Sequence, residues 1–430
     1  MEPQKRRPPG STDGGQFVGT TNPESTIELP AESNGTWPAV QFEDANWVPD
    51  PTIPYSNRER QSQTGHYKRA IPAFIAKADL EISSNLAAEI EEASSEIVRF
   101  DAEIGTALAS YGAILLRTEA VASSRIEQLT ASARAIATAE TDVDPESRNA
   151  SMIVANTHTM QAAIAKSDML DEQMILDMHA ILMETEPDIA GKWRRVQNWI
   201  GRGNAGPREA SHVPPNPDRV PELMRDLALF LRRTDLPVIA LAGAAHAQFE
   251  TIHPFVDGNG RTGRALIHAI LRNKGMTTAS TVPVSAGLLT DTDAYFAALT
   301  RYRSGDLEPI VSLMASASVR AVTNGRSLVT NLHSIRQGWD ERLKARKGAD
   351  AWRLADLLIR QPVVTRDFVT KELGVAVNNV NRVLLPFENA GILISSGSSS
   401  RGRRVWRSPE VLDELDDFAK RVGRRIVASR

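Results

Sequence analysis

The stretch His253-Pro-Phe-Val-Asp257-Gly-Asn-Gly-Arg261-Thr-Gly-Arg264 decides the fold expected for this chain. It combines an imidazole, a carboxylate, two glycines around an asparagine and two guanidinium groups. The two glycines allow the backbone to approach an anion and to direct N–H groups at it. The apolar run at 265–271 predicts a helix, so this loop would precede the positive end of a helix dipole. We therefore expect a loop that binds phosphate beside a general base.

Two other phosphate-binding motifs are alternatives to consider for this sequence. Gly258-x-Gly260-x-x-Gly263 also fits the dinucleotide-binding fingerprint, which needs a preceding strand and an acidic residue roughly 20 positions further on. Residues 239–249 are rich in alanine and predict a helix, and residues 277–284 contain no acid. The P-loop pattern Gly-x-x-x-x-Gly-Lys-Ser/Thr does not occur in the sequence. Both motifs are therefore disfavoured.

The stretch resembles the signature of the Fic (filamentation-induced-by-cAMP) family, His-x-Phe-x-Asp/Glu-Gly-Asn-Gly/Lys-Arg-x-x-Arg, at every fixed position. Members of this family transfer AMP from ATP to hydroxyl side chains. The resemblance implies a mostly α protein, with a Fic-type helical bundle and a small β-hairpin flap. It also implies a protein adenylyltransferase that takes ATP as co-substrate and modifies a Tyr, Ser or Thr hydroxyl of a target protein or of itself.

The resemblance assigns roles to the signature residues. His253 is the expected general base, with an ordinary pKa near 6.5. Asp257 is the expected Mg²⁺ ligand, because carboxylate oxygens suit this cation. Phe255 is expected to anchor the loop in the core. The remaining residues are expected to bind the ATP phosphates, the arginines through bidentate pairing: Gly258, Asn259, Gly260, Arg261 and Arg264.

A second motif lies upstream, in a helix expected at about 118–130. Ser123-Ser-Arg-Ile-Glu127-Gln resembles the family's inhibitory helix, Ser/Thr-x-x-x-Glu-Gly/Asn. Ser123 and Glu127 are one helical turn apart and share a face. In relatives with this helix the glutamate pairs with the second signature arginine, here Arg264, and displaces the γ-phosphate. Gln128 departs from the Gly/Asn at the end of the motif, which weakens the expected helix stop.

Residues 192–201 alternate large apolar and polar side chains and, with a return at 210–215, predict a β-hairpin. A buried irregular loop is the alternative. The hairpin resembles the family's flap, in which Trp199, Ile200 and Gly201 would lie along the nucleotide and the incoming target.

Two further side chains have candidate roles near this site. Tyr295 occupies the place where relatives have an aromatic residue near the adenosine. His246 could suggest a metal ligand, but without a third ligand or a His-Glu-x-x-His pattern we interpret it as structural.

Composition limits the class of protein. The 430 residues carry a net charge of −3 and no cysteine, which excludes a disulfide framework and cysteine-ligated zinc. The overall charge does not indicate a nucleic-acid binder. The first residues lack the apolar core of a signal peptide, and there is no run of about 18 apolar residues for a membrane span. We expect a cytoplasmic protein with no membrane partner.

Patterning along the chain predicts four segments. Residues 1–65 are rich in Pro, Gly, Ser and Asn and predict an extended or disordered arm, attached through Trp47 or Tyr55. The Fic domain is expected at 66–325, a linker helix at 326–349 and a winged helix-turn-helix-like domain at 350–430.

The last segment leaves a second function open, that of a nucleotide-responsive regulator that binds DNA. Basic residues of the expected hairpin could contact phosphates, namely Arg401, Arg403, Arg404 and Arg407. Polar residues of the expected second helix could read base edges, namely Asn378, Asn379, Asn381 and Arg382. The same fold could instead dock a protein. The sequence also leaves open removal of AMP at the same site, and whether the chain forms a homodimer.

Overall fold

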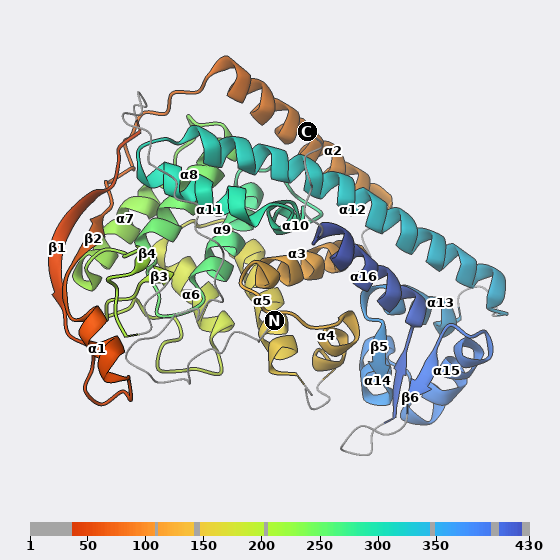
Figure 1. Ribbon diagram of the computed structural model, residues 1–430. Coiled ribbons are helices and arrows are strands. Elements are labelled where there is room, and N and C mark those ends of the chain that lie inside the picture. Colours follow the sequence, from red (N-terminus) through yellow and green to blue (C-terminus); the bar gives the residue numbers. More distant parts are fainter. Residues whose placement is uncertain are drawn as a thin grey trace, which may run out of the picture. The chain divides into compact units, whose positions relative to one another are not determined.

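The computed structural model describes most of the chain and is mostly helical, as the sequence predicts (Figure 1). The described residues are 37–107, 111–141, 147–201, 205–344, 349–396 and 404–423. Contacts divide the chain into two compact units. The first contains 1–91, 162–274 and 293–315, and the second contains 92–161, 275–292 and 316–430. No helix in the described ranges is both long and apolar enough to cross a membrane.

The centre of the first unit is helix α8 (Val238–Ile252), which packs against α7 (Val220–Leu231) and α9 (Asn259–Asn273). Every residue from Ile239 to Ile252 is buried. A helix that is apolar on all sides belongs in a core, and here it supports the loop that joins α8 to α9. Helices α6 (Glu172–Leu182) and α11 (Thr292–Arg303) complete this part of the unit.

The expected N-terminal arm is partly ordered, which corrects the prediction for residues 37–65. Strand β1 (Gln41–Trp47) pairs antiparallel with β2 (Gly65–Ile71), and α1 (Asn57–Gln63) lies between them (Figure 1). Composition hid these elements, because aromatic contacts rather than periodicity hold them. Trp47 Nε1 donates to the Ala205 carbonyl at 2.7 Å, so the expected attachment through Trp47 is confirmed. Residues 1–36 lie outside the described part of the chain.

The predicted flap hairpin is present but short. Strand β3 (Ile200–Gly201) pairs antiparallel with β4 (Ala210–His212). Residues 192–199 are not a strand, because several of their polar side chains bind main-chain carbonyls of neighbouring segments. Gly201 has a φ of 107°, and a Cβ there would lie 2.7 Å from Ser211 Oγ, so the turn of the flap requires glycine.

The second unit contains helices of very different length, and the first residues of α2 and α12 belong to the first unit. These helices are α2 (Ser84–Ala107), α3 (Gly112–Ile126), α4 (Ala133–Ala139), α5 (Arg148–Ala165), α10 (Val284–Leu289) and α12 (Glu308–Arg342). α12 is one continuous helix, although the sequence predicted a boundary near 326. Gly325 lets α12 pack closely against α2, since a Cβ there would come within 2.9 Å of the Phe100 ring.

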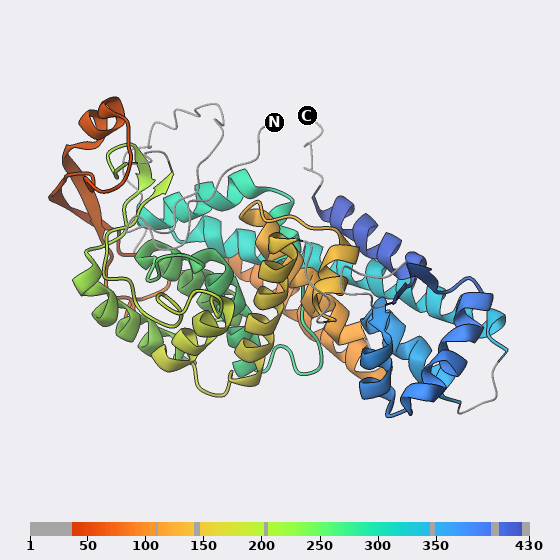
Figure 2. The ribbon, with the colours of Figure 1, turned by 90° about the horizontal axis from the view of Figure 1, so that it is seen from below.

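The C-terminal part of the second unit contains short helices and three short strands (blue in Figure 2). These are α13 (Asp350–Arg360), β5 (Val363–Thr365), α14 (Arg366–Leu373), η3 (Val377–Asn379), α15 (Val380–Asn389), β6 (Ile394–Ser396), β7 (Val405–Arg407) and α16 (Pro409–Val422). The strands form an antiparallel sheet in the order β5-β7-β6. Thr365 caps α14 by accepting from Phe368 N at 3.2 Å.

Candidate active site

His253 stands at the junction between α8 and the signature loop. It ends α8 in the left-handed conformation, with φ 49° and ψ 62°, and its N–H donates to the Phe249 carbonyl at 2.8 Å. A residue other than glycine in this conformation costs of order 1–3 kcal/mol and persists only where its surroundings hold it. The chain therefore uses backbone strain to place its candidate base.

The loop after His253 is closed by an asparagine. Asn259 Oδ1 accepts from Phe255 N at 2.8 Å, and Asn259 Nδ2 donates to Phe255 O at 2.9 Å. Asn198 Nδ2, from the flap segment, donates to the same carbonyl at 2.9 Å. Phe255 is fully buried, as predicted. The Asn259 amide thus shapes the loop, which differs from its expected role as a phosphate ligand.

His179 is a residue of this loop that the sequence did not reveal. Its ring stacks on Phe255 at 3.6 Å, and Gly191 N donates to its Nδ1 at 3.0 Å. Nε2 therefore carries the proton and donates to the Asp257 carbonyl at 3.0 Å. Burial lowers the pKa of His179 to about 4, so the ring stays neutral at ordinary pH. A lone histidine on a predicted helix carries no signal of such a role.

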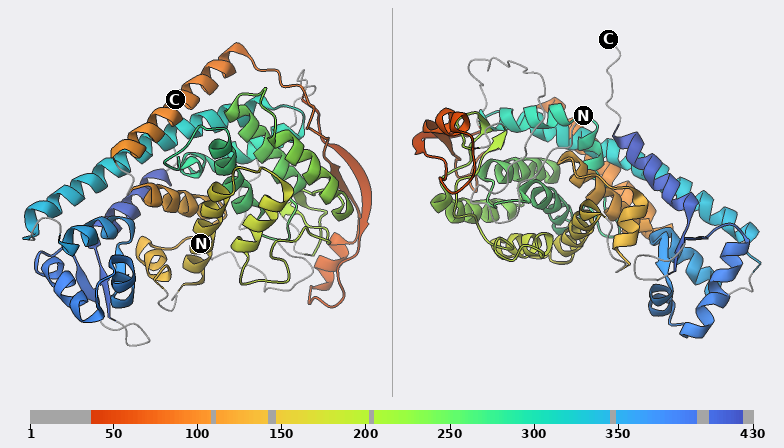
Figure 3. Two further views of the ribbon diagram at one scale, coloured as in Figure 1. Left: turned by 180° about the vertical axis from the view of Figure 1, so that it is seen from behind. Right: turned by 60° about the horizontal axis from the view of Figure 1, so that its bottom comes forward.

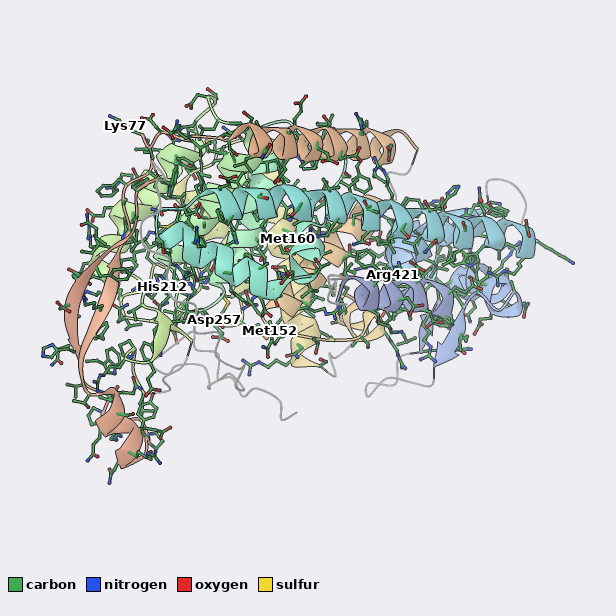
Figure 4. The ribbon with its side chains drawn as sticks, turned by 45° about the horizontal axis from the view of Figure 1, so that its top comes forward. Lys77, Met152, Met160, His212, Asp257 and Arg421 are labelled. Atoms are coloured by element: carbon green, nitrogen blue, oxygen red, sulfur yellow. The ribbon has the colours of Figure 1, made fainter. Side chains whose placement is uncertain are left out.

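Asp257 lies just before the N-terminus of α9 and is labelled in Figure 4. Its carboxylate is 22% exposed, and Oδ1 accepts from Gly258 N at 2.6 Å. Gly258 has a φ of 77°, and a Cβ there would lie 2.9 Å from Leu182 Cδ2. Helix α9 begins at Asn259 without a side-chain cap, and first-turn N–H groups have no partner within a helix. The expected helix N-terminus behind the loop is thus confirmed, and it suits an anion.

The two signature arginines lie on α9, and both are buried. Arg261 Nη2 is 3.8 Å from Asp257 Oδ1. Burial, and next the positive charge of Arg264, lower the pKa of His246 to about 3. Since both guanidinium groups are covered, direct contact with a phosphate requires neighbouring side chains to move.

Tyr295 and Trp199 do not have the exposure expected of nucleotide contacts. Each side chain is 1% exposed. The Tyr295 hydroxyl lies 2.8 Å from His246 Nε2, which also confirms the structural role of His246. Trp199 packs edge-on against Trp47, with ring centroids 5.1 Å apart. Both residues pack in the core, and Ile200 and Gly201 are the more accessible part of the flap. The expected nucleotide contacts of Trp199 and Tyr295 stay predictions.

The environment of His253 favours a neutral ring. Burial, and next the positive charges of Arg194 and Arg303, lower its pKa to about 3 against the opposing effect of Asp257. Its Nδ1 is 3.9 Å from Glu250 Oε2. An unprotonated imidazole is the form that can accept a proton. A pKa this far below neutral also weakens the ring as a base, so the role of His253 rests on its place in the loop.

The upstream motif lies in the second unit and is described by itself. Helix α3 ends at Ile126, earlier than the expected 130, and Glu127 occupies its C-cap position. Ser123 is fully buried. Gln128 adopts a φ of 62°, so the helix stop is present although this residue replaces the usual Gly/Asn. Asn156 on α5 donates to the Ala120 carbonyl at 3.0 Å and thereby holds α3.

Comparisons with known proteins point to one family. Residues 169–271 match the Fic/DOC family. The chain is 29% identical over 163 residues to a protein adenylyltransferase Fic of Nematostella vectensis, covering 37% of this chain and 35% of that protein. It is 32% identical over 152 residues to protein adenylyltransferase fic-1 of Caenorhabditis elegans, covering 34% of this chain and 27% of that protein. The chain thus spans only about a third of the length of these curated relatives.

A solved structure gives the same answer for the fold. The structure of a Fic family protein from Desulfovibrio desulfuricans G20 superposes with a TM-score of 0.50 at 23% identity, covering 76% of this chain and 97% of that one. The matched family segment contains α6, the flap, α8 and the signature loop. The complete signature and these matches together establish that this chain contains a Fic domain.

Proposed function

We propose that this protein is a protein adenylyltransferase, which moves AMP from ATP to a Tyr, Ser or Thr hydroxyl of a target protein or of itself. The observation that carries the proposal is the loop between α8 and α9. It places a neutral His253 and the accessible Asp257 carboxylate directly before an uncapped helix N-terminus. The relatives matched above are named protein adenylyltransferases, which agrees with this activity.

In the proposed step, the target hydroxyl oxygen attacks the α-phosphorus of ATP. The bond from the α-phosphorus to the bridging oxygen breaks, and pyrophosphate leaves with the electron pair. His253 accepts the hydroxyl proton, which typically contributes about 10² to 10⁴ in rate. The first-turn N–H groups of α9, including that of Gly260, would stabilise charge on the phosphate oxygens. The N–H of the N-cap residue Gly258 already donates to Asp257 Oδ1. The accessible edge at Ile200 and Gly201 could align a target segment by backbone pairing.

Magnesium is part of the proposal, with Asp257 as its protein ligand. Within the described ranges no group of three or more His, Cys, Asp or Glu side chains could hold a metal by itself. Mg²⁺ usually needs only one or two carboxylates when substrate phosphates supply the other oxygens, so a single accessible carboxylate fits. When bound, the ion would neutralise phosphate charge.

We propose that Glu127 inhibits the enzyme, with Ser123 on the same helical face. The glutamate would occupy the donors of Arg264 that the γ-phosphate needs, because one guanidinium fork cannot serve both anions. The position of Glu127 at the end of α3, followed by the αL turn at Gln128, supports this role. Removal of AMP from a modified protein by hydrolysis would use the same site, with Glu127 positioning the attacking water.

The domain scheme is also a proposal: a Fic domain at 66–325, a linker at 326–349, and a winged helix-turn-helix domain at 350–430 in a cytoplasmic protein. The order α13-β5-α14-α15-β6-β7 supports a winged helix. DNA binding by that domain is the second candidate function. The observation in its favour is a row of exposed polar residues on η3 and α15, namely Asn378, Asn379, Asn381 and Arg382.

The basic hairpin gives DNA binding less support. Arg404 pairs with Glu388 at 2.9 Å, which partly neutralises it. Arg401 and Arg403 lie outside the described residues, and Arg407 is half-buried. A gel shift at two salt concentrations tests this function, because phosphate-driven binding must weaken steeply with salt.

The main proposal is tested by incubating three proteins with α-labelled ATP and a cell lysate. These are the wild type, Glu127→Gly, and Glu127→Gly combined with His253→Ala. Label should appear on protein strongly with Glu127→Gly and not with the double variant. Transfer that is equally strong in the double variant would exclude His253 as the base, and no transfer by any of the three would exclude adenylylation of proteins in that lysate.

A further inference from the structure

Arg194 is a buried arginine that binds carbonyls rather than a carboxylate. Its side chain is 2% exposed. Its guanidinium donates to His253 O at 2.9 Å, Val196 O at 3.1 Å, Pro215 O at 2.6 Å and Ile252 O at 3.4 Å. Its own main-chain N–H donates to the Pro254 carbonyl at 2.9 Å. No carboxylate of the described residues forms an ion pair with it.

These four carbonyls come from two parts of the site. Ile252 and His253 end α8, where the last carbonyls of a helix have no partner within the helix and the dipole is negative. Val196 and Pro215 flank the flap hairpin formed by β3 and β4. A planar guanidinium offers five N–H donors in fixed directions, so one side chain can serve both parts.

We propose that Arg194 is a positioning residue for AMP transfer, which holds His253 in its left-handed conformation and fixes the base of the flap to the same point. The proposal rests on the proposed function. Because burial costs a charged group heavily, a site that keeps this arginine must gain from its hydrogen bonds. Holding the base and the flap together keeps the distance between the proton acceptor and the target hydroxyl constant, and a shift of about 1 Å in such a distance can reduce a rate a hundredfold.

The test compares Arg194→Lys and Arg194→Met in the active Glu127→Gly background. Lysine keeps the positive charge but carries its donors on one nitrogen, so it cannot reach carbonyls on both sides. Both variants should lower kcat at least tenfold and change the KM for ATP less than threefold. The matched control is Arg195→Met, because the neighbouring Arg195 is exposed. A Lys variant with full kcat, or a loss that only follows the folded fraction, would overturn the proposal.

A readout without catalysis keeps the proposal separate from the proposed function. Hydrogen exchange should accelerate at residues 252–258 and at 196–201 together in Arg194→Lys, while the rest of α8 stays protected. If exchange in these two segments matches the wild type, Arg194 does not hold them, whatever the enzyme does. If exchange accelerates but Glu127→Gly itself transfers no AMP, only the proposed function fails.

A second inference concerns the second unit, where the C-terminal segment binds the helix that ends at Glu127. Helix α16 lies beside α3 and α4 (Figures 1 and 3). The Arg125 guanidinium donates to the Ala419 carbonyl on α16. Asp416, also on α16, accepts from Ala133 N at the start of α4 at 2.9 Å. The turn that contains Glu127 is therefore held on both sides by α16.

Other contacts extend this attachment along α3 and α4. Arg117 on α3 donates to the Arg360 carbonyl at 2.7 Å and to Gln361 Oε1 at 2.9 Å, at the end of α13. Gln361 in turn donates to the Ala137 carbonyl on α4 at 2.7 Å. A small pocket remains between α3, α4 and α16. Its apolar lining includes Val121, Ala122, Ile136, Leu415 and Phe418. Imperfect packing at this place lowers the free energy needed to separate α16 from α3.

We infer that the C-terminal segment controls the inhibitory helix: α16 holds the turn after α3, so that displacement of α16 releases Glu127 and raises AMP transfer. This inference rests on the proposed inhibition by Glu127. Whatever binds the C-terminal segment and displaces α16 would then activate the enzyme, so binding at the C-terminal segment would be coupled to AMP transfer.

The test is the double variant Arg125→Met with Asp416→Ala, which removes both contacts to α16. AMP transfer should rise at least threefold, and adding Glu127→Gly should give no more activity than Glu127→Gly alone. Asp413→Ala is the matched control, since Asp413 is an exposed carboxylate of the same helix. Activity equal to the wild type, with unchanged hydrogen exchange at 123–135, would overturn the inference. Faster exchange there without any effect of Glu127→Gly would instead reject inhibition by Glu127.

Discussion

Arg194 and Arg125 both donate to main-chain carbonyls, Arg194 from a buried position in the first unit and Arg125 from a half-buried position in the second. Arg194 engages four carbonyls, and burial lowers its pKa to about 9, so it remains charged at neutral pH. Arg125 is half-buried and engages the Ala419 carbonyl, and burial also lowers its pKa. The difference teaches how one kind of contact can serve two purposes. The four hydrogen bonds of Arg194 make a rigid support. The single hydrogen bond of Arg125, beside a pocket, makes a contact that can open.

The largest expected effect concerns His253, whose conformation Arg194 is proposed to hold. His253→Ala should reduce AMP transfer by a factor of about 10² to 10⁴, because it removes the proton acceptor. Affinity for ATP should change little, since the phosphates are expected to bind α9 and Asp257. Initial rates and nucleotide titrations measure the two separately. An equal loss of rate and affinity would demote His253 to a structural residue.

Acid should weaken the first unit more than the second. Four histidines there have lowered pKa values: His179 to about 4, His246 and His253 to about 3, and His212 well below its ordinary value. Below about pH 6.5 the unfolded chain binds more protons than the folded one, so stability is lost as pH falls. Each group contributes up to about 1.4 kcal/mol per pH unit.

Urea unfolding between pH 7 and pH 5 measures this loss, and hydrogen exchange locates it. Protection in residues 238–273 should fall before protection in α2 and α12. An earlier loss of protection in α2 and α12 would contradict the assignment. Replacing His246 by Phe should make the pH dependence shallower.

In the turn that Arg125 helps to hold, Glu127→Gly should raise AMP transfer at least tenfold. This rise corresponds to a barrier lower by about 1.4 kcal/mol. The carboxylate and the γ-phosphate cannot both use the donors of Arg264. Self-modification with α-labelled ATP measures the effect, and His253→Ala in the same background is the control. Rates equal to the wild type would reject inhibition by Glu127. Loss of an AMP-removing activity would instead make Glu127 a catalytic residue for the reverse reaction.

The smallest expected effect comes from Tyr295, which the structure buries. Tyr295→Phe should change the KM for ATP less than twofold, because its ring has no surface to offer a nucleotide. It should lower the free energy of unfolding by about 1–3 kcal/mol, since it leaves the His246 nitrogen without its hydroxyl partner. A large rise in KM with unchanged stability would restore the adenosine contact expected from sequence.

Local patterns predicted the parts of the molecule that local interactions decide. The apolar run at 265–271 lies within α9, and the alanine-rich residues 239–249 lie within α8, as the sequence predicted. The signature loop was readable because its residues are contiguous. Arg194 and His179 were not readable, because their partners are carbonyls of distant segments and any residue type can supply a carbonyl. The exposure of Trp199 and Tyr295 likewise depends on packing, which residue type alone does not fix.

Gln128 has a consequence for how active the resting enzyme is. It holds a φ of 62° at the turn after α3, where the related motif has Gly or Asn. A side chain in this conformation costs about 1–2 kcal/mol, which destabilises the conformation in which the turn is formed. Under the proposed inhibition by Glu127, this cost would oppose the inhibited conformation and so raise basal AMP transfer. Gln128→Gly would then lower the basal rate of AMP transfer, and a β-branched residue at this position would raise it. The identity of this one residue would therefore tune the basal activity.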